Sequence, residues 1–310
     1  MLINFRIIRL CILILIIILL IKFLFKRSSS EKYLIEKDLL TYGNVSWPKQ
    51  RIPRLIHQTY KTYDIPPVWN RSVQSIIETN FQDFQYYRWT HEEMRLFVQK
   101  YEPKFYRKVY INYKYEMQRI DSFRYVLMYH LGGIYIDMDN GSNYPLKSVL
   151  RTMEALDPYS PYLALFPSED TFGLQTDFLI STSNHPLFKQ MISNLDSFNH
   201  NYLVHHLTIL LSAGPLYATF QEKFFKQTNQ HVVRILHNQI YKSIFWKTNG
   251  GTWFERDTLI ILYIHKNRYT ILRYFIVILI FIIILFIKHR FVSMKSNFIR
   301  FIHIKFHRNK

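Results

Sequence analysis

The sequence predicts an α/β domain with a largely parallel sheet, placed between two transmembrane helices. Three observations lead to this prediction. From residue 51 onward, segments with the apolar pattern of strands alternate with segments that have helical periodicity, which favours an α/β architecture. A glycine pair precedes a hydrophobic strand that ends in two acidic residues, Asp137 and Asp139. Long apolar runs stand near both ends of the chain.

The two apolar runs cover residues 7–25 and 274–287 and are rich in Ile, Leu and Phe. Since about 20 apolar residues cross a bilayer, we expect a transmembrane anchor at 7–25 and a transmembrane helix at 271–287. The alternatives are a cleaved signal peptide for the first run and a buried core helix for the second. Residues 288–310 are basic and contain no Asp or Glu, which is typical of a cytosolic tail. We therefore expect residues 1–6 and the tail in the cytosol, with the domain between the spans in the lumen.

The chain of 310 residues has a formal net charge of +18. Basic, aromatic-rich chains are candidates for binding single-stranded nucleic acid, but the two spans and the predicted lumenal placement argue against that partner. The single cysteine, Cys11, lies in the first apolar run, so no disulfide framework can form within the chain. Glycosylation sequons begin at Asn44, Asn70 and Asn140, and we expect glycans only at the first two.

Between the spans we expect a stem at 26–50, a folded domain at 51–257 and a linker at 258–270. Thr90 with Glu93 forms a capping box, which predicts the start of a helix. The other elements follow from periodicity and from proline or glycine at their ends. The expected strands are 52–59, 85–89, 134–136, 162–166 and 178–181. The expected helices are 67–79, the segment after Thr90, 116–131, 145–156, 186–198 and 204–226.

Acidic and basic residues gather around the strand at 134–136. Asp137 and Asp139 follow it, and alternation along an extended chain puts both on one side. Ligands bind at the carboxyl ends of strands in such sheets, and oxygen ligands there suit Mg²⁺ or Mn²⁺. The alternative is a solvated turn with two acids. Asp121 and Arg124 lie three residues apart on one face of the preceding helix, either as a local ion pair or as part of a cleft.

Taken together, these motifs resemble the glycosyltransferases with the DXD sugar-binding motif, and most of all glycosyltransferase family 32. That family contains inositol phosphorylceramide mannosyltransferases and outer-chain mannosyltransferases. The resemblance covers roughly residues 51–257, with the motifs in the same order. The matching segments are Asp121-Ser-Phe-Arg124-Tyr125, Gly132-Gly133-Ile-Tyr-Ile-Asp137-Met-Asp139, Ile52–Thr59, Tyr87–Thr90, Gly173–Phe178 with Ser181 and His185-Pro186, and Ser212–Pro215.

The resemblance implies a GT-A fold, which is a Rossmann-like domain for nucleotide-diphospho-sugar transfer, and a retaining reaction. It implies that Asp137 and Asp139 hold Mn²⁺ (or Mg²⁺) together with the donor diphosphate. Asp121 and Arg124 would bind the sugar and ribose of the donor. The residues implied in the nucleotide pocket are Ile56, His57, Gln58 and Thr59.

Two assignments have alternatives. Asp177 is the candidate contact for the acceptor, and a loop-capping role is the alternative. Asp257 is the candidate third metal ligand. The family often has a Ser-Trp-His segment followed by Asp near the end of the domain, whereas Phe254 stands here in the place of a histidine that could reach the metal. Glu255 or a water molecule is therefore an alternative third ligand.

The expected function is mannose transfer from GDP-mannose to an inositol phosphorylceramide-type sphingolipid in the Golgi or ER membrane. Anchors at both ends of the domain favour a lipid acceptor over an outer-chain glycan. Two alternatives stay open. The first is the same fold with another nucleotide sugar or a glycan acceptor. The second is an inactive membrane scaffold or partner subunit, which only Phe254 favours.

Overall fold

The computed structural model describes residues 32–43, 49–169 and 173–250, with a few separate residues between 263 and 281. By its contacts the chain divides into residues 27–257 and the two terminal segments. All the elements described below belong to residues 27–257.

The predicted spans lie outside the described residues: all of 7–25, and all but a few positions of 271–287. Among the residues that are described, no helix combines the length and the apolar character needed to cross a bilayer.

Strands and helices alternate along the domain, and most predicted elements are present with ends shifted by a few residues. The strands are β1 (Lys32–Leu34), β2 (Leu55–Tyr60), β3 (Gln85–Thr90), β4 (Gly133–Ile136), β5 (Asn140–Ser142), β6 (Tyr162–Glu169), β7 (Gly173–Leu174), β8 (Phe178–Ser181), β9 (His231–Leu236) and β10 (Phe245–Lys247). The helices are α2 (Glu36–Tyr42), α3 (Pro67–Asn80), α4 (His91–Tyr101), α5 (Pro103–Lys108), the 3₁₀ helix η1 (Tyr110–Asn112), α6 (Glu116–His130), α7 (Lys147–Leu156), α8 (Pro186–Phe198), α9 (His205–Ser212), α10 (Pro215–Phe224) and α11 (Asn238–Ile244).

The main sheet follows the order β1-β9-β6-β8-β4-β2-β3, with β7 paired to β6. Along this path β8 runs antiparallel to both of its neighbours, and every other neighbouring pair is parallel. The predicted α/β architecture with a largely parallel sheet is therefore confirmed. β4 lies inside the sheet and is buried along its whole length, so the residues that follow it emerge at the end of a fully covered strand.

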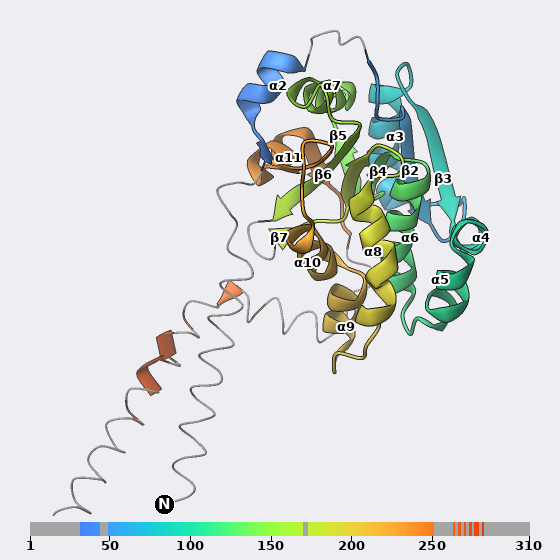
Figure 1. Cartoon of the computed structure of the whole chain (residues 1–310), viewed down its shortest axis with the longest axis vertical. Coiled ribbons are helices and arrows are strands. Elements are labelled where there is room, and N and C mark those ends of the chain that lie inside the picture. The colour runs from blue at the N-terminus through green and yellow to red at the C-terminus, as the bar shows by residue number, and fades with distance from the viewer. Residues whose placement is uncertain are drawn as a thin grey trace, which may run out of the picture. The chain divides into compact units, whose positions relative to one another are not determined.

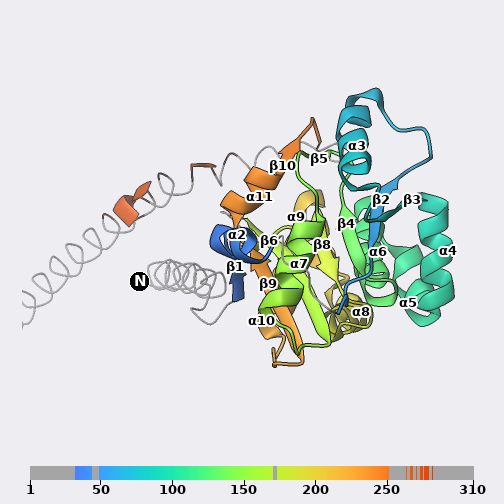
Figure 2. The same ribbon diagram turned by 90° about the horizontal axis from the view of Figure 1, so that it is seen from above.

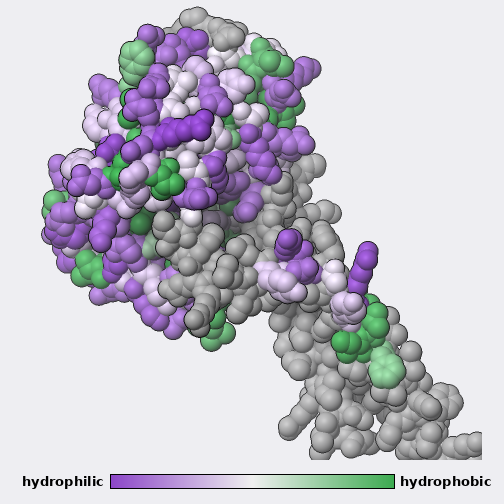
Figure 3. Space-filling model, turned by 180° about the vertical axis from the view of Figure 1, so that it is seen from behind, coloured by the Kyte–Doolittle hydropathy of each residue, from purple (hydrophilic) through white to green (hydrophobic). Residues whose placement is uncertain are grey.

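Helices cover both faces of the sheet (Figure 1), and each face has its own apolar core. Alternation along β4 sends Tyr135 into one core and Ile134 with Ile136 into the other. The first core is closed by α4, α5, α6, α8 and α10, and the second by α3, α7 and α11. The described surface in Figure 3 is mostly polar, with separate small apolar areas. Burial of apolar side chains on both faces is the main stabilising contribution to this architecture.

Part of the predicted stem is folded. Residues 26–50 were expected to form a stem, yet β1 pairs in parallel with β9 and α2 packs against α7. Leu34 is fully buried in the core between the sheet and α7. A strand of three residues gains its stability from this pairing rather than from its own sequence, so periodicity alone does not reveal it.

One predicted helix is wrong as a single element. The segment 204–226 forms two helices, α9 and α10, that are separated at Ala213-Gly214. Pro215 occupies the first turn of α10, where its missing N–H leaves no unmade helical bond. A continuous helix would put that proline in an interior, where it removes a backbone bond and clashes with the preceding turn.

The capping box at the start of α4 is confirmed. The Thr90 side chain accepts a hydrogen bond from the backbone N–H of Glu93, with 3.2 Å between Oγ1 and N. The Glu93 carboxylate accepts in return from the backbone N–H of Thr90 at 2.8 Å. Two backbone donors at the helix start are thereby satisfied.

Replacing Gly132 with alanine is expected to lower the free energy of unfolding by about 2 kcal/mol or more. Gly132 has a φ of +68°, and a Cβ atom there would lie 2.7 Å from the backbone oxygen of Ser181. Both the backbone conformation and the rigid neighbour oppose any side chain. Denaturant unfolding of the full chain measures the change, with Ser193→Ala on the exposed side of α8 as the control. An unchanged unfolding free energy for the Gly132 variant would contradict the expectation.

His185 is expected to make the fold less stable as the pH falls below about 6.5. Its ring is buried, Nδ1 accepts from the Leu187 N–H, and Nε2 lies 3.2 Å from the Val232 oxygen. Burial lowers the pKa of His185 to about 3, so the neutral ring is the folded form. A lowered folded-state pKa means that the unfolded chain binds the extra proton. The contribution is therefore fully present above the unfolded pKa and is lost toward pH 3.

His185→Asn tests this because asparagine keeps an N-cap acceptor but does not titrate. Between pH 6 and pH 4, unfolding free energies measured against denaturant should depend less steeply on pH in the variant. The difference should be about 1.4 kcal/mol per pH unit. Equal slopes in the two proteins would show that His185 is not the titrating group.

Candidate active site

The site begins where β4 ends. Ile136 closes the strand opposite Phe178 of β8, and the backbone N–H of Asp137 continues the ladder by donating to the Asp177 oxygen at 2.9 Å. Asp137, Met138 and Asp139 then leave the sheet together. Met138 packs against Trp69 of α3, which anchors the turn between the two carboxylates. Pairing with β8 thus places Asp177 beside the acidic pair.

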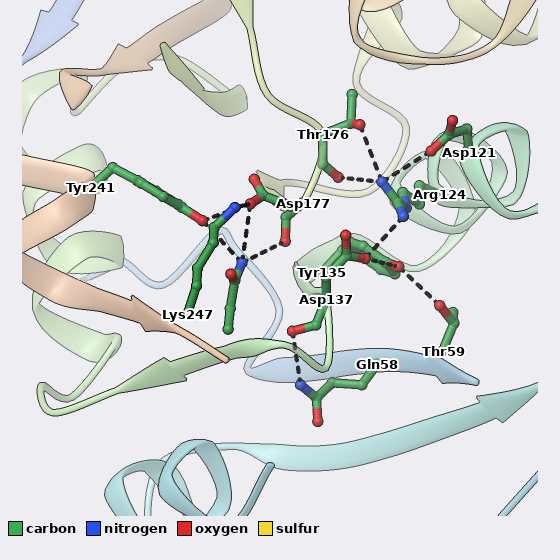
Figure 4. Close-up of polar contacts among 11 residues, drawn as sticks. Gln58, Thr59, Asp121, Arg124, Tyr135, Asp137, Thr176, Asp177, Tyr241 and Lys247 are labelled. Atoms are coloured by element: carbon green, nitrogen blue, oxygen red, sulfur yellow. Dashed lines mark hydrogen bonds and ion pairs between the residues drawn. The ribbon is translucent and has the colours of Figure 1, made fainter. Parts of the chain in front are cut away.

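Arg124 of α6 connects the acidic groups (Figure 4). Its Nη2 lies 2.9 Å from Oδ1 of Asp137, and its Nη1 lies 3.0 Å from Oδ1 of Asp121. Nη1 donates its hydrogen bonds to the backbone oxygen and the hydroxyl of Thr176, at 2.9 and 3.1 Å. Asp121 Oδ1 has no hydrogen-bond partner among the described residues. The contact between Asp121 and Arg124 is therefore a charge interaction without hydrogen-bond alignment.

A second set of contacts holds Asp137 from the β2 side. The Tyr135 hydroxyl donates to Oδ1 of Asp137 at 2.7 Å and lies 2.9 Å from the hydroxyl of Thr59. The guanidinium of Arg124 stands over the Tyr135 ring at 4.8 Å. One oxygen of Asp137 therefore serves both an arginine and a tyrosine.

Burial dominates the electrostatics of this group. It raises the pKa of Asp121 to about 7 and that of Asp137 to about 6, although the Arg124 guanidinium opposes the shift in both. Burial also raises the pKa of Asp139, and the Lys247 ammonium opposes it. A raised pKa means that ionising these carboxylates in the folded protein requires more free energy than in water. An added positive charge beside them would lower that free energy.

Asp139 differs from Asp137 in having a carboxylate without a side-chain partner among the described residues. Its backbone oxygen accepts from the N–H and the hydroxyl of Thr248, at 2.8 and 3.2 Å. Gly250 runs directly against the carboxylate, because a Cβ atom at Gly250 would lie 2.0 Å from Oδ2 of Asp139. The segment after β10 therefore lies directly against the Asp139 carboxylate.

The donor set fits a hard divalent cation in type. Carboxylate oxygens are the usual protein ligands of Mg²⁺ and Mn²⁺, which commonly complete their shells with water and phosphate oxygens. Within the described ranges, however, no three His, Cys, Asp or Glu residues lie close enough to hold a metal ion between them. Phe254, Glu255 and the predicted third ligand Asp257 lie outside those ranges. Among the described residues, the carboxylates of Asp137 and Asp139 are the candidates to hold such a cation.

The four residues implied in the nucleotide pocket are consecutive in β2, but their side chains do not line one surface. Ile56 and His57 are fully buried on opposite faces of β2, and Ile56 belongs to the core closed by α3 and α7. His57 Nε2 lies 3.2 Å from the Gly132 oxygen, while its Nδ1 accepts from the Trp89 indole at 3.2 Å. Both ring nitrogens of His57 are occupied by the protein. Its side chain therefore supports the β4 start rather than a ligand.

Gln58 and Thr59 lie nearer the acidic pair. The Gln58 amide is 3.4 Å from the backbone oxygen of Asp137 and accepts from the Tyr86 hydroxyl at 2.7 Å. Thr59 reaches Asp137 only through the Tyr135 hydroxyl. Of the four residues, these two at the carboxyl end of β2 can influence a ligand at the site.

Three residues beside Asp177 were missed from the sequence. Asn140, Tyr241 and Lys247 all donate to Oδ2 of Asp177, at 3.3, 2.7 and 2.5 Å. Figure 2 shows β10 next to β5, between α3 and α11. Only Asn140 has a local signal, since it follows the acidic pair directly. Tyr241 and Lys247 reach the site through the pairing of β10 with β5, which no short-range pattern reports.

Asn140 also begins one of the three sequons. Its side chain is fully buried, and its Nδ2 contacts Asp177 and the Tyr241 hydroxyl. Glycosylation requires an exposed amide, so the prediction that Asn140 carries no glycan agrees with this placement. Asn70 is exposed, and Asn44 lies outside the described residues.

The Ser212–Pro215 turn packs over the helix that carries Asp121. The Tyr125 hydroxyl donates to the Ala213 oxygen at 2.5 Å. A Cβ atom at Gly214 would lie 2.9 Å from the Ile209 oxygen and 3.3 Å from Oδ2 of Asp121. A glycine at this position therefore lets the turn approach the buried acid closely.

A strand-end acidic pair whose first carboxylate is tied to a buried arginine is the kind of site that, with a divalent cation, transfers groups from nucleoside diphosphates. A family model described as "Glycosyltransferase sugar-binding region containing DXD motif" matches residues 66–157, which include Asp121, Arg124, Asp137 and Asp139. The chain belongs to this glycosyltransferase family, because it is also 31% identical over 229 residues to a relative of which it covers 69%.

That relative is inositol phosphoceramide mannosyltransferase 1 of Schizosaccharomyces pombe, and the match covers 72% of this chain. Inositol phosphoceramide mannosyltransferase 2 of the same organism is 34% identical, over 70% of this chain and 62% of the relative. The mannosyl phosphorylinositol ceramide synthase CSH1 of Saccharomyces cerevisiae is 34% identical over 68% of this chain. The chain spans only about half of that yeast protein, since 55% of it is covered.

Among solved structures, a chain titled "PaToxG Glycosyltransferase" has a TM-score of 0.40 and 17% sequence identity, over 60% of this chain and 73% of that chain. A likeness at this level is too weak to bear on the fold or the site.

Proposed function

We propose that this chain transfers mannose from GDP-mannose to an inositol phosphoceramide-type lipid, with Mn²⁺ or Mg²⁺ as cofactor. The relatives at 31–34% identity are named as enzymes that add mannose to inositol phosphoceramide, and their names specify neither the donor nor the metal. The observation that bears most on the proposal is the buried Arg124, held between Asp121 and Asp137 at the end of β4. A buried cation between two acids at a strand end suits an anionic, hydroxyl-bearing donor.

Asp139, with Asp137, would hold the cofactor metal, which supplies positive charge to a diphosphate leaving group. Arg124 adds a fixed positive charge beside the same position and keeps Asp137 in place. Asp121 offers a buried oxygen without a hydrogen-bond partner to a sugar hydroxyl. Asp177 is the residue for the acceptor side. Because the leaving phosphate can take the proton of an acceptor that attacks the same face, the proposal includes a GT-A fold with retention and no separate base.

The proposal also includes membrane attachment at 7–25 and 271–287, with the catalytic domain in the lumen of the Golgi or ER and both termini cytosolic. It is supported by the two apolar runs and by the basic residues at 288–310, which lack Asp and Glu. Attachment at both ends of the domain would keep the active site close to the bilayer, where a lipid acceptor lies.

A donor screen tests the proposed function. The full chain in detergent would receive GDP-mannose, UDP-galactose, UDP-glucose or UDP-N-acetylglucosamine, with Mn²⁺ and inositol phosphoceramide. The expected result is a mannosylated lipid from GDP-mannose alone, lost on chelation, with the anomeric configuration of the donor retained. Transfer from another nucleotide sugar would show that the transferred sugar is not mannose. No turnover with any donor would contradict the proposed enzymatic activity and favour an inactive membrane scaffold or partner subunit.

A further inference from the structure

The carboxylate of Asp177 is bonded unevenly. Its Oδ2 accepts three hydrogen bonds, from the amide of Asn140, the hydroxyl of Tyr241 and the ammonium of Lys247. Its Oδ1 is buried and has no hydrogen-bond partner among the described residues. We call the three donors the Asp177 clamp; Figure 4 shows Tyr241 and Lys247 reaching Asp177 on the side away from Arg124.

The fold builds this clamp from two strands and a helix. Lys247 of β10 stands directly opposite Asn140 of β5, so both side chains lie on the same face of the pair. Close approach of the strands is secured at Gly141, where a Cβ atom would lie 2.3 Å from the Trp246 ring. Tyr241 comes from α11, the helix that leads into β10. Asn140 and Tyr241 of the clamp are thus held in packed positions, whereas the Lys247 side chain is 47% exposed and reaches Asp177 from the surface.

The two carboxylate oxygens of Asp177 therefore differ in their surroundings. Three donors, one of them the Lys247 ammonium, converge on Oδ2, whereas Oδ1 is a buried acceptor that lacks a donor among the described residues. Asn140 Oδ1 is a second buried acceptor without a partner in the described part of the chain. Unmade bonds of this kind are costly, and hydroxyl groups of a ligand would satisfy them.

A metal ion is the competing occupant of Asp177 Oδ1. The described residues contain no group of three His, Cys, Asp or Glu that could hold one. Lys247 already places a positive charge 2.5 Å from the other oxygen of the same carboxylate. Charge repulsion between an ammonium and a divalent cation disfavours the metal here. A neutral hydroxyl donor meets no such repulsion.

We propose that the Asp177 clamp, with Lys247 as its positioning residue, orients Asp177 so that Oδ1 accepts a hydrogen bond from a hydroxyl of the acceptor's polyol headgroup. The inference rests on the proposed function, because it names the residues that hold the acceptor at that site. It concerns binding and orientation and includes no proton transfer. The hydroxyl could also belong to the donor sugar, and the two sources predict different kinetics.

The test measures both Michaelis constants in the full chain. Tyr241→Phe removes one donor, Lys247→Met removes the charged donor at similar length, and Lys247→Arg restores a charged donor. We expect each of the first two variants to raise the KM for inositol phosphoceramide about tenfold, as loss of one charge-assisted hydrogen bond does. The KM for GDP-mannose should change much less, and Lys247→Arg should recover most of the acceptor KM. Lys226→Met removes the same charge from an exposed position and should leave both constants unchanged.

A rise in the donor KM alone would assign the hydroxyl to the donor sugar and overturn the acceptor assignment. A rise in the Mn²⁺ requirement without either KM change would make Asp177 a metal ligand and overturn the proposal. The proposal would also be overturned if every variant that still transfers mannose had unchanged KM values for inositol phosphoceramide and GDP-mannose.

A second measurement does not need turnover. Binding of free inositol 1-phosphate, measured by ligand-observed NMR with GDP and Mn²⁺ present, should weaken about tenfold in Lys247→Met and recover in Lys247→Arg. If the wild type binds this headgroup in a clamp-dependent way without turnover, the proposed function fails and the clamp stands. If the wild type transfers mannose but inositol 1-phosphate binds equally well to the Lys247 variants, the inference about the clamp fails and the proposed function stands.

Discussion

Arg124→Met is expected to destabilise the fold by about 3–5 kcal/mol at neutral pH, the scale of removing one partner from a buried ion pair. Arg124 and Asp121 are only 3% and 2% exposed, so water cannot replace the lost charge. Asp137 loses its closest cation in the same change. The acids would then take up protons, and the wider gap between folded and unfolded pKa values would appear as lost stability.

Two comparisons separate this effect from a general loss of packing. Adding Asp121→Asn to the methionine variant removes one uncompensated acid and should recover part of the stability without recovering transfer. Lys108→Met, on α5, breaks an exposed pair with Asp196 and should cost under about 1 kcal/mol.

The pH dependence gives a third check. Raised folded-state pKa values contribute stability below the unfolded pKa that is lost as pH rises, so the deficit of Arg124→Met should shrink from pH 8 to pH 5. Denaturant unfolding at both pH values measures it. A deficit that is the same at both, or that persists in the double variant, would locate the damage in packing rather than in charge.

Local patterns were sufficient for the centre of the site. The glycine pair 132–133, the hydrophobic strand and the two acids are contiguous, and each step has a short-range physical reason. Asp121 and Arg124 share a helix face at a spacing of three, which the structure turns into the 3.0 Å contact. The plain alternative of a local pair was half correct, because Arg124 also reaches Asp137.

The edges of the sheet needed long-range information. β9 (His231–Leu236) is a short apolar run, which periodicity cannot tell from a buried helical segment, and β1 has only three residues. Lys32 pairs with Arg234 about two hundred positions away in the sequence. The same argument applies to the clamp, since Lys247 and Asp177 are separated by 70 residues and meet only after β10 pairs with β5.

Asp139→Asn is expected to abolish transfer while leaving the fold intact or slightly more stable. The loss should be on the order of 10³-fold in kcat, the scale of removing one preorganised electrostatic group. Stability should not fall, because no side chain among the described residues hydrogen-bonds the carboxylate and asparagine has nearly the same shape. Burial raises the pKa of Asp139, so the ionised acid opposes folding at neutral pH and its neutral replacement relieves that cost.

Metal binding separates this prediction from a merely structural one. If Asp139 is the more accessible ligand, Mn²⁺ should raise the melting temperature of the wild type, since a ligand that binds only the folded state stabilises it. The Asn variant should lose that shift, whereas Asp64→Asn, an exposed acid outside the site, should retain it. Opposite changes in activity and stability at one residue are the mark of a group kept for function. A variant that retained the Mn²⁺ shift would move the metal to Asp137 and the segment that contains Asp257, and Asp139 would then be an acid that shapes the loop against Gly250.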